Sequence, residues 1–195
     1  MKFNYFTFSL LFVVLLVGCS KSVDLEGVNL QNGCQIIQKV PQWDKYLKQT
    51  QKKWGVPPGL VLAIIYQEST FNPDAKNSSS SAYGYAQVIN GTWTEYKRSV
   101  DKDASRSDFD DSADFIGWYL SNIKNKDKLA WSNSANLYMA YMLGEAGYKS
   151  FITGNGTAQQ KKSWVAKYKI AQKVASNARN YNKQLINCKV ENKSK

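Results

Sequence analysis

The chain has 195 residues, a formal net charge of +11 and no histidine. The lack of histidine excludes Ser-His-Asp and Cys-His nucleophile systems, His-based zinc sites and most imidazole acid–base chemistry. The sequence also has no glycine-rich phosphate loop. Any catalysis is therefore expected to rest on carboxylates, without a metal or a cofactor. The positive charge favours a polyanionic partner.

The chain begins with a basic residue, Lys2, and an apolar stretch that ends at Cys19. This stretch is too short and too weakly flanked for a transmembrane span and is typical of a secretion signal. Its last four residues, LVGC, resemble a bacterial lipobox, in which the cysteine is diacylated and the preceding peptide is removed. We therefore predict a lipoprotein signal peptide over residues 1–18, with membrane attachment through acyl chains on Cys19. The alternative is an ordinary signal peptide with an incidental cysteine.

The residues after Cys19 indicate where such a lipoprotein would work. Ser20, rather than Asp, follows the lipidated position, which favours the outer membrane of a Gram-negative bacterium and thus the periplasm. The polyanion in this compartment is the cell wall with its peptide carboxylates, so nucleic acid is not an expected partner. Residues 19–32 are polar and unpatterned and predict a tether, which would keep the folded domain close to the membrane.

Two further cysteines, Cys34 and Cys188, lie near the two ends of the expected folded part. In an oxidising compartment two such cysteines are more often paired than free. We therefore predict a disulfide that closes almost the whole domain into one loop. Spacing alone leaves a second reading, two separately buried thiols.

The pattern after residue 32 is helical almost throughout. It predicts one mainly α-helical domain over residues 33–188 and a disordered tail over residues 189–195. Residues 69–90, rich in Ser, Asn, Gly and Pro, predict a loop or a small irregular sheet. The expected helices cover residues 41–56, 58–68, a segment with Trp93 and Tyr96 capped by Thr92, 108–123, a segment from 134 that stops near Gly144 or Gly147, and 158–185.

Glu68 has an unusual position in the helix expected over residues 58–68. Val61, Ile64 and Ile65 fall on the same helical face, so a carboxyl group stands where an apolar residue is expected. A carboxyl group held against apolar side chains has a raised pKa and stays protonated long enough to act as a general acid. The other reading is a salt-bridged glutamate at a helix end.

Three motifs in order resemble the soluble lytic transglycosylase (SLT) family. They are ESTFNP at residues 68–73, AYGYAQ at 82–87 and AYMLGEAG from Ala140. The family's lysozyme-like domain carries E-S, then F-N-P, G-L-M-Q and A-Y-N-A-G. The resemblance covers about residues 56–147. It implies a lysozyme-like helical fold with a small loop or β insertion after the catalytic helix.

The resemblance also implies a reaction in which Glu68 is the catalytic residue. Glu68 would protonate the leaving oxygen of the MurNAc-GlcNAc β-1,4 bond of peptidoglycan. It would then accept the proton of the muramic acid C6 hydroxyl, which attacks C1 and leaves a 1,6-anhydro-MurNAc end. This route agrees with the lack of a second carboxylate inside a convincing motif, which an ordinary glycosidase needs.

Four substrate-binding residues follow from the same resemblance. Gln87 and Tyr141 match the second and third motifs, and Tyr85 replaces a leucine of the second. The stretch before the second motif is one residue longer than in the family pattern. Ser78 is therefore the best match to a substrate-contacting serine, and the alternatives are Asn77 and Ser79.

Two other functions stay open at this point. A relative of goose-type lysozyme would hydrolyse the same bond. A non-catalytic lipoprotein would use the fold to bind the cell wall or to join a secretion apparatus. Met142 stands where the third motif usually has Asn, which fits the non-catalytic reading, whereas an intact Glu68 argues against it. The expected partners are peptidoglycan strands, with cell-wall or secretion machinery proteins as further candidates.

Overall fold

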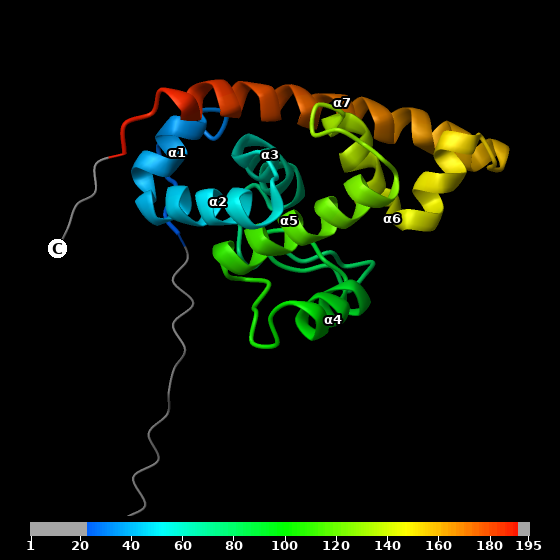
Figure 1. Cartoon of the computed structure of the whole chain (residues 1–195), viewed down its shortest axis with the longest axis horizontal. Helices are drawn as coiled ribbons and strands as arrows, with labels where there is room; N and C mark the ends of the chain where they lie inside the picture. The colour runs from blue at the N-terminus through cyan, green and yellow to red at the C-terminus, as the bar shows by residue number, and fades with distance from the viewer. Residues whose placement is uncertain (1–22, 191–195) are drawn as a thin grey trace, which may run out of the picture.

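The computed structural model describes residues 23–190, so the predicted signal peptide and Cys19 lie outside the described residues. Within this range the chain is mainly α-helical, as predicted, and six of its helices correspond to predicted ones, whereas α1 does not. Figure 1 shows α7 along one side of the molecule and α4 on the opposite side, with α3 and α5 between them. The helices are α1 (Gly33–Lys39), α2 (Pro41–Trp54), α3 (Pro58–Ser69), α4 (Asn90–Ser99), α5 (Phe109–Lys126), α6 (Ser134–Thr153) and α7 (Ala158–Ile186).

Helix α3 forms the centre of the domain. It begins at Pro58, whose fixed φ suits the first turn of a helix. Residues 59–65 are all buried, and a helix that is apolar all round belongs inside a core. Gly59 lets α7 approach closely, because a Cβ there would lie 2.5 Å from the Ala178 carbonyl oxygen. The helix that carries Glu68 in its last turn is thus held against α7.

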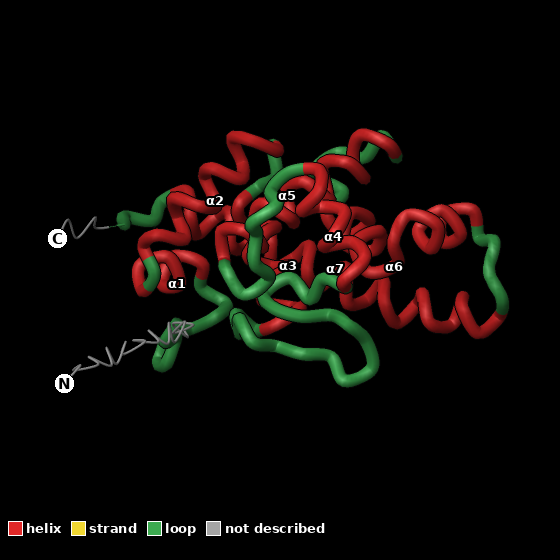
Figure 2. Tube along the Cα trace, turned by 90° about the horizontal axis from the view of Figure 1, so that it is seen from below, coloured by secondary structure: helices red, strands yellow, loops and turns green. Residues whose placement is uncertain are grey.

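The segment between α3 and α4 is a loop with little regular structure. Two isolated antiparallel bridges join Lys76 with Tyr83 and Tyr83 with Val88. Figure 2 shows the described chain as helices joined by loops, with no strand drawn. The Arg106 guanidinium supports this loop, since Nη1 donates a 2.7 Å hydrogen bond to the Val88 carbonyl. The predicted loop or irregular sheet is therefore a loop with two bridges.

Two helices begin or end differently from the prediction. The expected cap Thr92 lies inside α4, whose N-cap is Ile89, because the Asn-Gly pair before Thr92 forms the first turn of the helix. Helix α6 is interrupted at Gly144, one of the two predicted stops, but a second helical segment continues past Gly147 to Thr153. Gly144 has φ 66° and ψ 172°, a conformation that glycine adopts without steric cost, so the helix kinks there and then resumes.

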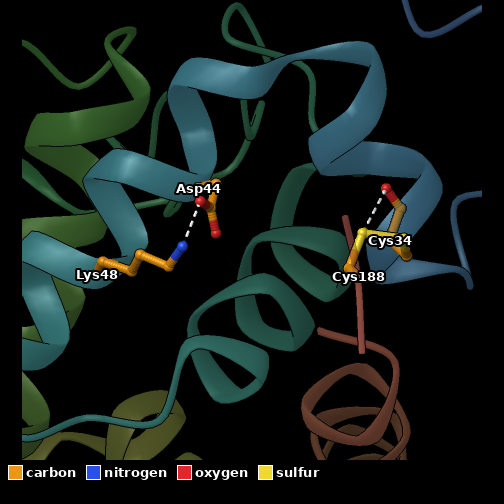
Figure 3. Close-up of polar contacts among 4 residues, drawn as sticks. All are labelled: Cys34, Asp44, Lys48 and Cys188. Atoms are coloured by element: carbon orange, nitrogen blue, oxygen red, sulfur yellow. Dashed lines mark hydrogen bonds and ion pairs between the residues drawn. A yellow bond between two sulfur atoms is a disulfide. The ribbon is translucent and has the colours of Figure 1, made fainter. Parts of the chain in front are cut away.

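The two ends of the described chain meet at one end of the molecule. The structure joins Cys34 of α1 to Cys188, just after α7, in a disulfide with the two Cα atoms 5.4 Å apart. Figure 3 shows this bond beside α2, on which Lys48 Nζ lies 2.6 Å from Asp44 Oδ2. The disulfide encloses every helix from α2 to α7.

Residues 23–32 pack on the domain, in contrast to the tether predicted over residues 19–32. The Tyr181 hydroxyl donates a hydrogen bond to the Leu30 carbonyl. The apolar residues of this segment fit neither helical nor strand spacing, which is why the sequence pattern does not reveal their burial. The disordered tail predicted over residues 189–195 is wrong for Val190, which packs on the core. Residues 191–195 are not described. The packed apolar side chains of the first segment are Val23, Leu25, Val28 and Leu30.

No helix among residues 23–190 is both long and apolar enough to cross a bilayer.

Candidate active site

Glu68 lies in the last turn of α3, where the helix ends abruptly. Thr70 and Phe71 have φ values of 52° and 62°, a left-handed conformation that is uncommon outside glycine. Phe71 is fixed in this position because its ring stacks on Trp43, with centroids 5.6 Å apart. The buried Ser69 hydroxyl donates to the Ile65 carbonyl at 3.1 Å. The chain therefore turns away directly after Glu68 and leaves its side chain half-buried at the edge of the core.

A cleft of about 580 Å³ opens at Glu68. Its volume falls in the range of sites that bind small molecules. Side chains from α3, the following loop, α4, α5, α6 and α7 line it, so the cleft depends on the whole fold and not on one motif. Besides Glu68, its polar side chains are Asn77, Gln87, Thr92, Tyr119, Tyr138, Tyr141 and Lys167.

Tyr138 is the hydrogen-bond partner of Glu68. Its hydroxyl donates to Glu68 Oε1 at 2.7 Å, and the tyrosine is 2% exposed. Burial and the negative charge of Glu68 raise the pKa of Tyr138 above its ordinary value, so the phenol keeps its proton and acts as a donor. The bond orients the Glu68 carboxyl group. Within residues 23–190, the other carboxylate oxygen accepts no protein hydrogen bond and is available to a bound molecule.

Two opposing effects set the pKa of Glu68. Burial raises the pKa above the ordinary value, and this is the largest effect. The hydrogen bond from Tyr138 and the positive charge of Lys167 act in the opposite direction, because both stabilise the carboxylate. Glu68 therefore holds its proton to a higher pH than a free glutamate, while its carboxylate form is also stabilised. Such a group can serve as an acid and then as a base.

Three of the predicted site residues, Glu68, Gln87 and Tyr141, line the same cleft. Gln87 Nε2 donates to the Ala75 carbonyl at 2.9 Å, which fixes the loop and the orientation of the side-chain amide. The Tyr141 hydroxyl donates to the Ala86 carbonyl at 2.6 Å. Gln87 thus fixes the loop internally and Tyr141 holds the loop against α6, and both side chains form part of the wall of the cleft.

The structure places Tyr85 in the core, contrary to its predicted role in substrate binding, and Ser78 is not among the residues that line the cleft. Tyr85 is 2% exposed and packs edge-on against Phe109, and burial raises the pKa of its hydroxyl to about 12. Ser78 is exposed on the loop, whereas its neighbour Asn77, an alternative in the sequence analysis, lines the cleft. Motif matching gives positions along the chain but not the side on which each side chain lies.

Sequence reasoning missed three cleft residues, Tyr119, Tyr138 and Lys167. Tyr138 precedes Tyr141 by three residues on α6, and residues three apart share a helical face. Helical spacing from Tyr141 could therefore have found Tyr138. The positions of Tyr119 on α5 and Lys167 on α7 depend on how these helices pack, and no local pattern reveals them.

No other acidic residue among residues 23–190 lines the cleft. Among the residues of the described chain that line it, Glu68 is the only acid. Glu145 forms an ion pair with Lys126. Residues 23–190 also contain no group of three or more His, Cys, Asp or Glu residues placed to hold a metal ion. Four aspartates gather in a separate pocket between α2 and α5, and they are Asp101, Asp110, Asp111 and Asp114.

A helical domain with a half-buried glutamate at the end of its central helix, facing a cleft, belongs to the lysozyme-like class. A family model described as "Transglycosylase SLT domain" matches residues 7–188. The chain therefore belongs to the SLT transglycosylase family, as its three motifs predicted. This membership implies peptidoglycan as the substrate.

Proposed function

We propose that the protein is a peptidoglycan lytic transglycosylase that cleaves the MurNAc-GlcNAc β-1,4 bond with Glu68 as its catalytic residue. The observation that carries the proposal is that Glu68 is the one acid among the described residues that line the cleft. A glycosidase with two carboxylates would need a second acid about 5–10 Å away across the bond. The reaction must therefore obtain its nucleophile from elsewhere.

The first step needs a proton donor. Protonated Glu68 gives its proton to the glycosidic oxygen, the bond from this oxygen to C1 of the muramic acid breaks, and positive charge develops on C1. The raised pKa of Glu68 keeps the donor protonated before this step.

The second step needs a base. The C6 hydroxyl of the same sugar attacks C1 and passes its proton to the Glu68 carboxylate, which restores the acid form. The product ends in 1,6-anhydro-MurNAc, and no water is consumed. The intramolecular hydroxyl has the large effective concentration of a tethered nucleophile.

Tyr138 supports both steps by holding the Glu68 carboxyl group. Its hydrogen bond to Oε1 stabilises the carboxylate that forms after the first proton transfer, while burial favours the acid form. We therefore describe Tyr138 as a positioning residue. The balance of the two effects lets one side chain act as acid and base in turn.

The experiment is a digest of purified cell-wall sacculi in water enriched in heavy oxygen. We expect soluble muropeptides one water lighter than a reducing end and without the heavy label. Labelled reducing ends would instead indicate a goose-type hydrolase. A folded protein that releases no soluble product would support the non-catalytic reading.

A further inference from the structure

A second groove continues from the catalytic cleft between α6 and α7. It has a volume of about 440 Å³ and shares Leu143 and Lys167 with the cleft. Figure 1 shows the second half of α6 beside the start of α7, at the end of the molecule opposite α1. The kink at Gly144 separates the cleft part of α6 from the groove part. A molecule held at Glu68 can therefore extend directly into this groove.

The lining of the groove is suited to a peptide. The α6 wall carries the small residues Ala146 and Gly147, which leave room for a chain. Hydroxyl and amide groups on the walls can donate to and accept from peptide groups. They belong to Ser150, Gln160 and Ser163.

The charge of the groove is positive. Helix α7 contains seven Lys or Arg residues and no Asp or Glu. Within residues 23–190, no salt bridge involves a cation of α7. Lys167 is half-buried where the groove meets the cleft, and such a cation favours an anionic ligand. The groove thus offers a partly desolvated cation that forms no salt bridge among residues 23–190, although its charge also acts on Glu68.

The opposite end of the cleft has a different charge. A neighbouring pocket shares Thr92 and Tyr119 with the cleft, and its charged residues are three acids and one lysine. They are Glu95, Asp127, Glu145 and Lys126. Carboxylates on a ligand are therefore favoured toward Lys167 and disfavoured toward this pocket.

We infer that the groove beside Lys167 binds the acidic peptide attached to muramic acid, and that Lys167 recognises one of its carboxylates. The inference rests on the proposed function, because it concerns another part of the same substrate. The peptide leaves the muramic acid ring through the lactyl group on C3, so it emerges close to the ring whose C1 faces Glu68. Lys167 would thus make the enzyme prefer strands that carry peptides.

The experiment compares two substrates in the full mature protein. One is glycan strands with their peptides, and the other is the same strands after an amidase has removed the peptides. We expect wild-type kcat/KM to be about tenfold or more higher for the peptide-bearing strands, as a hydrogen bond to a charged group allows. We expect Lys167→Met to bring this ratio close to one.

The ratio of kcat/KM for peptide-bearing strands to kcat/KM for peptide-free strands separates recognition of the peptide from catalysis. Lys167 also affects the pKa of Glu68, but that effect acts on both substrates and cancels in the ratio. Lys162→Met is the matched control, because Lys162 is exposed on the same helix and lines neither the cleft nor the groove. We expect this control to keep the wild-type ratio. Equal rates on both substrates in the wild type, or an unchanged ratio in Lys167→Met, would overturn the inference.

A binding measurement separates failure of this inference from failure of the proposed function. If neither substrate is cleaved, the proposed function is wrong, and the groove is tested by titration with the free peptide released by the amidase. We expect binding of this peptide, about tenfold weaker binding to Lys167→Met, and no binding of the same peptide with its carboxylates amidated. Equal binding of the acidic and amidated peptides, or binding of neither, would overturn carboxylate recognition.

Discussion

The two ends of this domain are held together in different ways. At one end, the disulfide between Cys34 and Cys188 and the packed residues 23–32 tie the two ends of the described chain to the core. The cleft end has no covalent cross-link among the described residues, and single hydrogen bonds such as Tyr138 to Glu68 fix its side chains. We infer that one end mainly provides stability and the other chemistry. Substitutions at the two ends should therefore affect different measurements.

Glu68→Gln should have the largest effect and should be confined to the cleft. The amide fits the same space but cannot donate and recover a proton. We expect the rate of peptidoglycan cleavage to fall by about 10²–10⁴-fold, the usual contribution of general acid–base catalysis. The melting temperature should not decrease. Release of soluble muropeptides and a thermal melt measure the two quantities.

The matched control for this variant is Glu26→Gln, an exposed acid on the opposite end of the domain. It should keep the wild-type rate. If Glu68→Gln retained more than about a tenth of the wild-type rate, Glu68 would not be the catalytic acid.

The variant Cys34→Ser with Cys188→Ser should show the reverse pattern. Loss of a bond that closes a long loop is expected to lower the free energy of unfolding by about 2–5 kcal/mol. At temperatures where the variant is still folded, its cleavage rate should match the wild type. Urea denaturation would measure the loss of stability, and rate measurements well below the melting point of the variant would test whether its activity is unchanged. A large loss of rate in the folded variant would show that the two ends are coupled.

Tyr138→Phe should have a smaller effect on catalysis and a distinctive effect on its pH dependence. The lost hydrogen bond stabilises the carboxylate, so its removal should raise the pKa of Glu68 further. The alkaline limb of the profile of kcat/KM against pH should therefore move to higher pH. We expect kcat to fall by about tenfold, the value of one hydrogen bond to a charged group.

Tyr148→Phe is the control for Tyr138→Phe, because Tyr148 is equally buried on α6 and lies outside the cleft lining. Its pH profile should match the wild type. The same shift in both variants would indicate a general loosening of α6 and not a specific contact with Glu68.

The sequence predicted the parts of the site that depend on local pattern. The apolar face that contains Val61 and Ile65 predicted both the helix and the unusual place of Glu68, and the structure has both. Gln87 and Tyr141 line the cleft as expected. In each case, the motif or the helical period carries the information.

Features that depend on packing were not predictable in this way. The loop directs Tyr85 into the core and Asn77 into the cleft, and only the fold decides between these two directions. Lys167 is about a hundred residues from Glu68 along the chain, and α7 brings it to the cleft by packing on α3 and α6. The residues between 23 and 32 are apolar at irregular spacing, so their contact with the core leaves no periodic signal.

The smallest expected effect links the chemistry of Glu68 to stability. Burial raises the folded-state pKa of Glu68 above its ordinary value of 4.5. Below that ordinary pKa the group is protonated in both folded and unfolded chains and has no effect on the free energy of unfolding. As pH rises, the unfolded chain loses the proton first, so the folded state loses stability until the pH exceeds the folded-state pKa.

Glu68→Gln removes this titration, so the variant should be more stable than the wild type at pH 7, and the difference should shrink as the pH falls from the folded-state pKa toward about 4.5 and be lost below it. Urea denaturation of both proteins at pH 4 and pH 7, at one ionic strength, measures the difference. Other acids, such as Asp111 with its pKa raised to about 6, titrate in both proteins and cancel. The stability loss in the variant without the disulfide should not follow this pH dependence, because bonded cysteines do not titrate. A difference between Glu68→Gln and wild type that is the same at both pH values would mean that burial does not raise the pKa of Glu68, and the acid role would lose its physical basis.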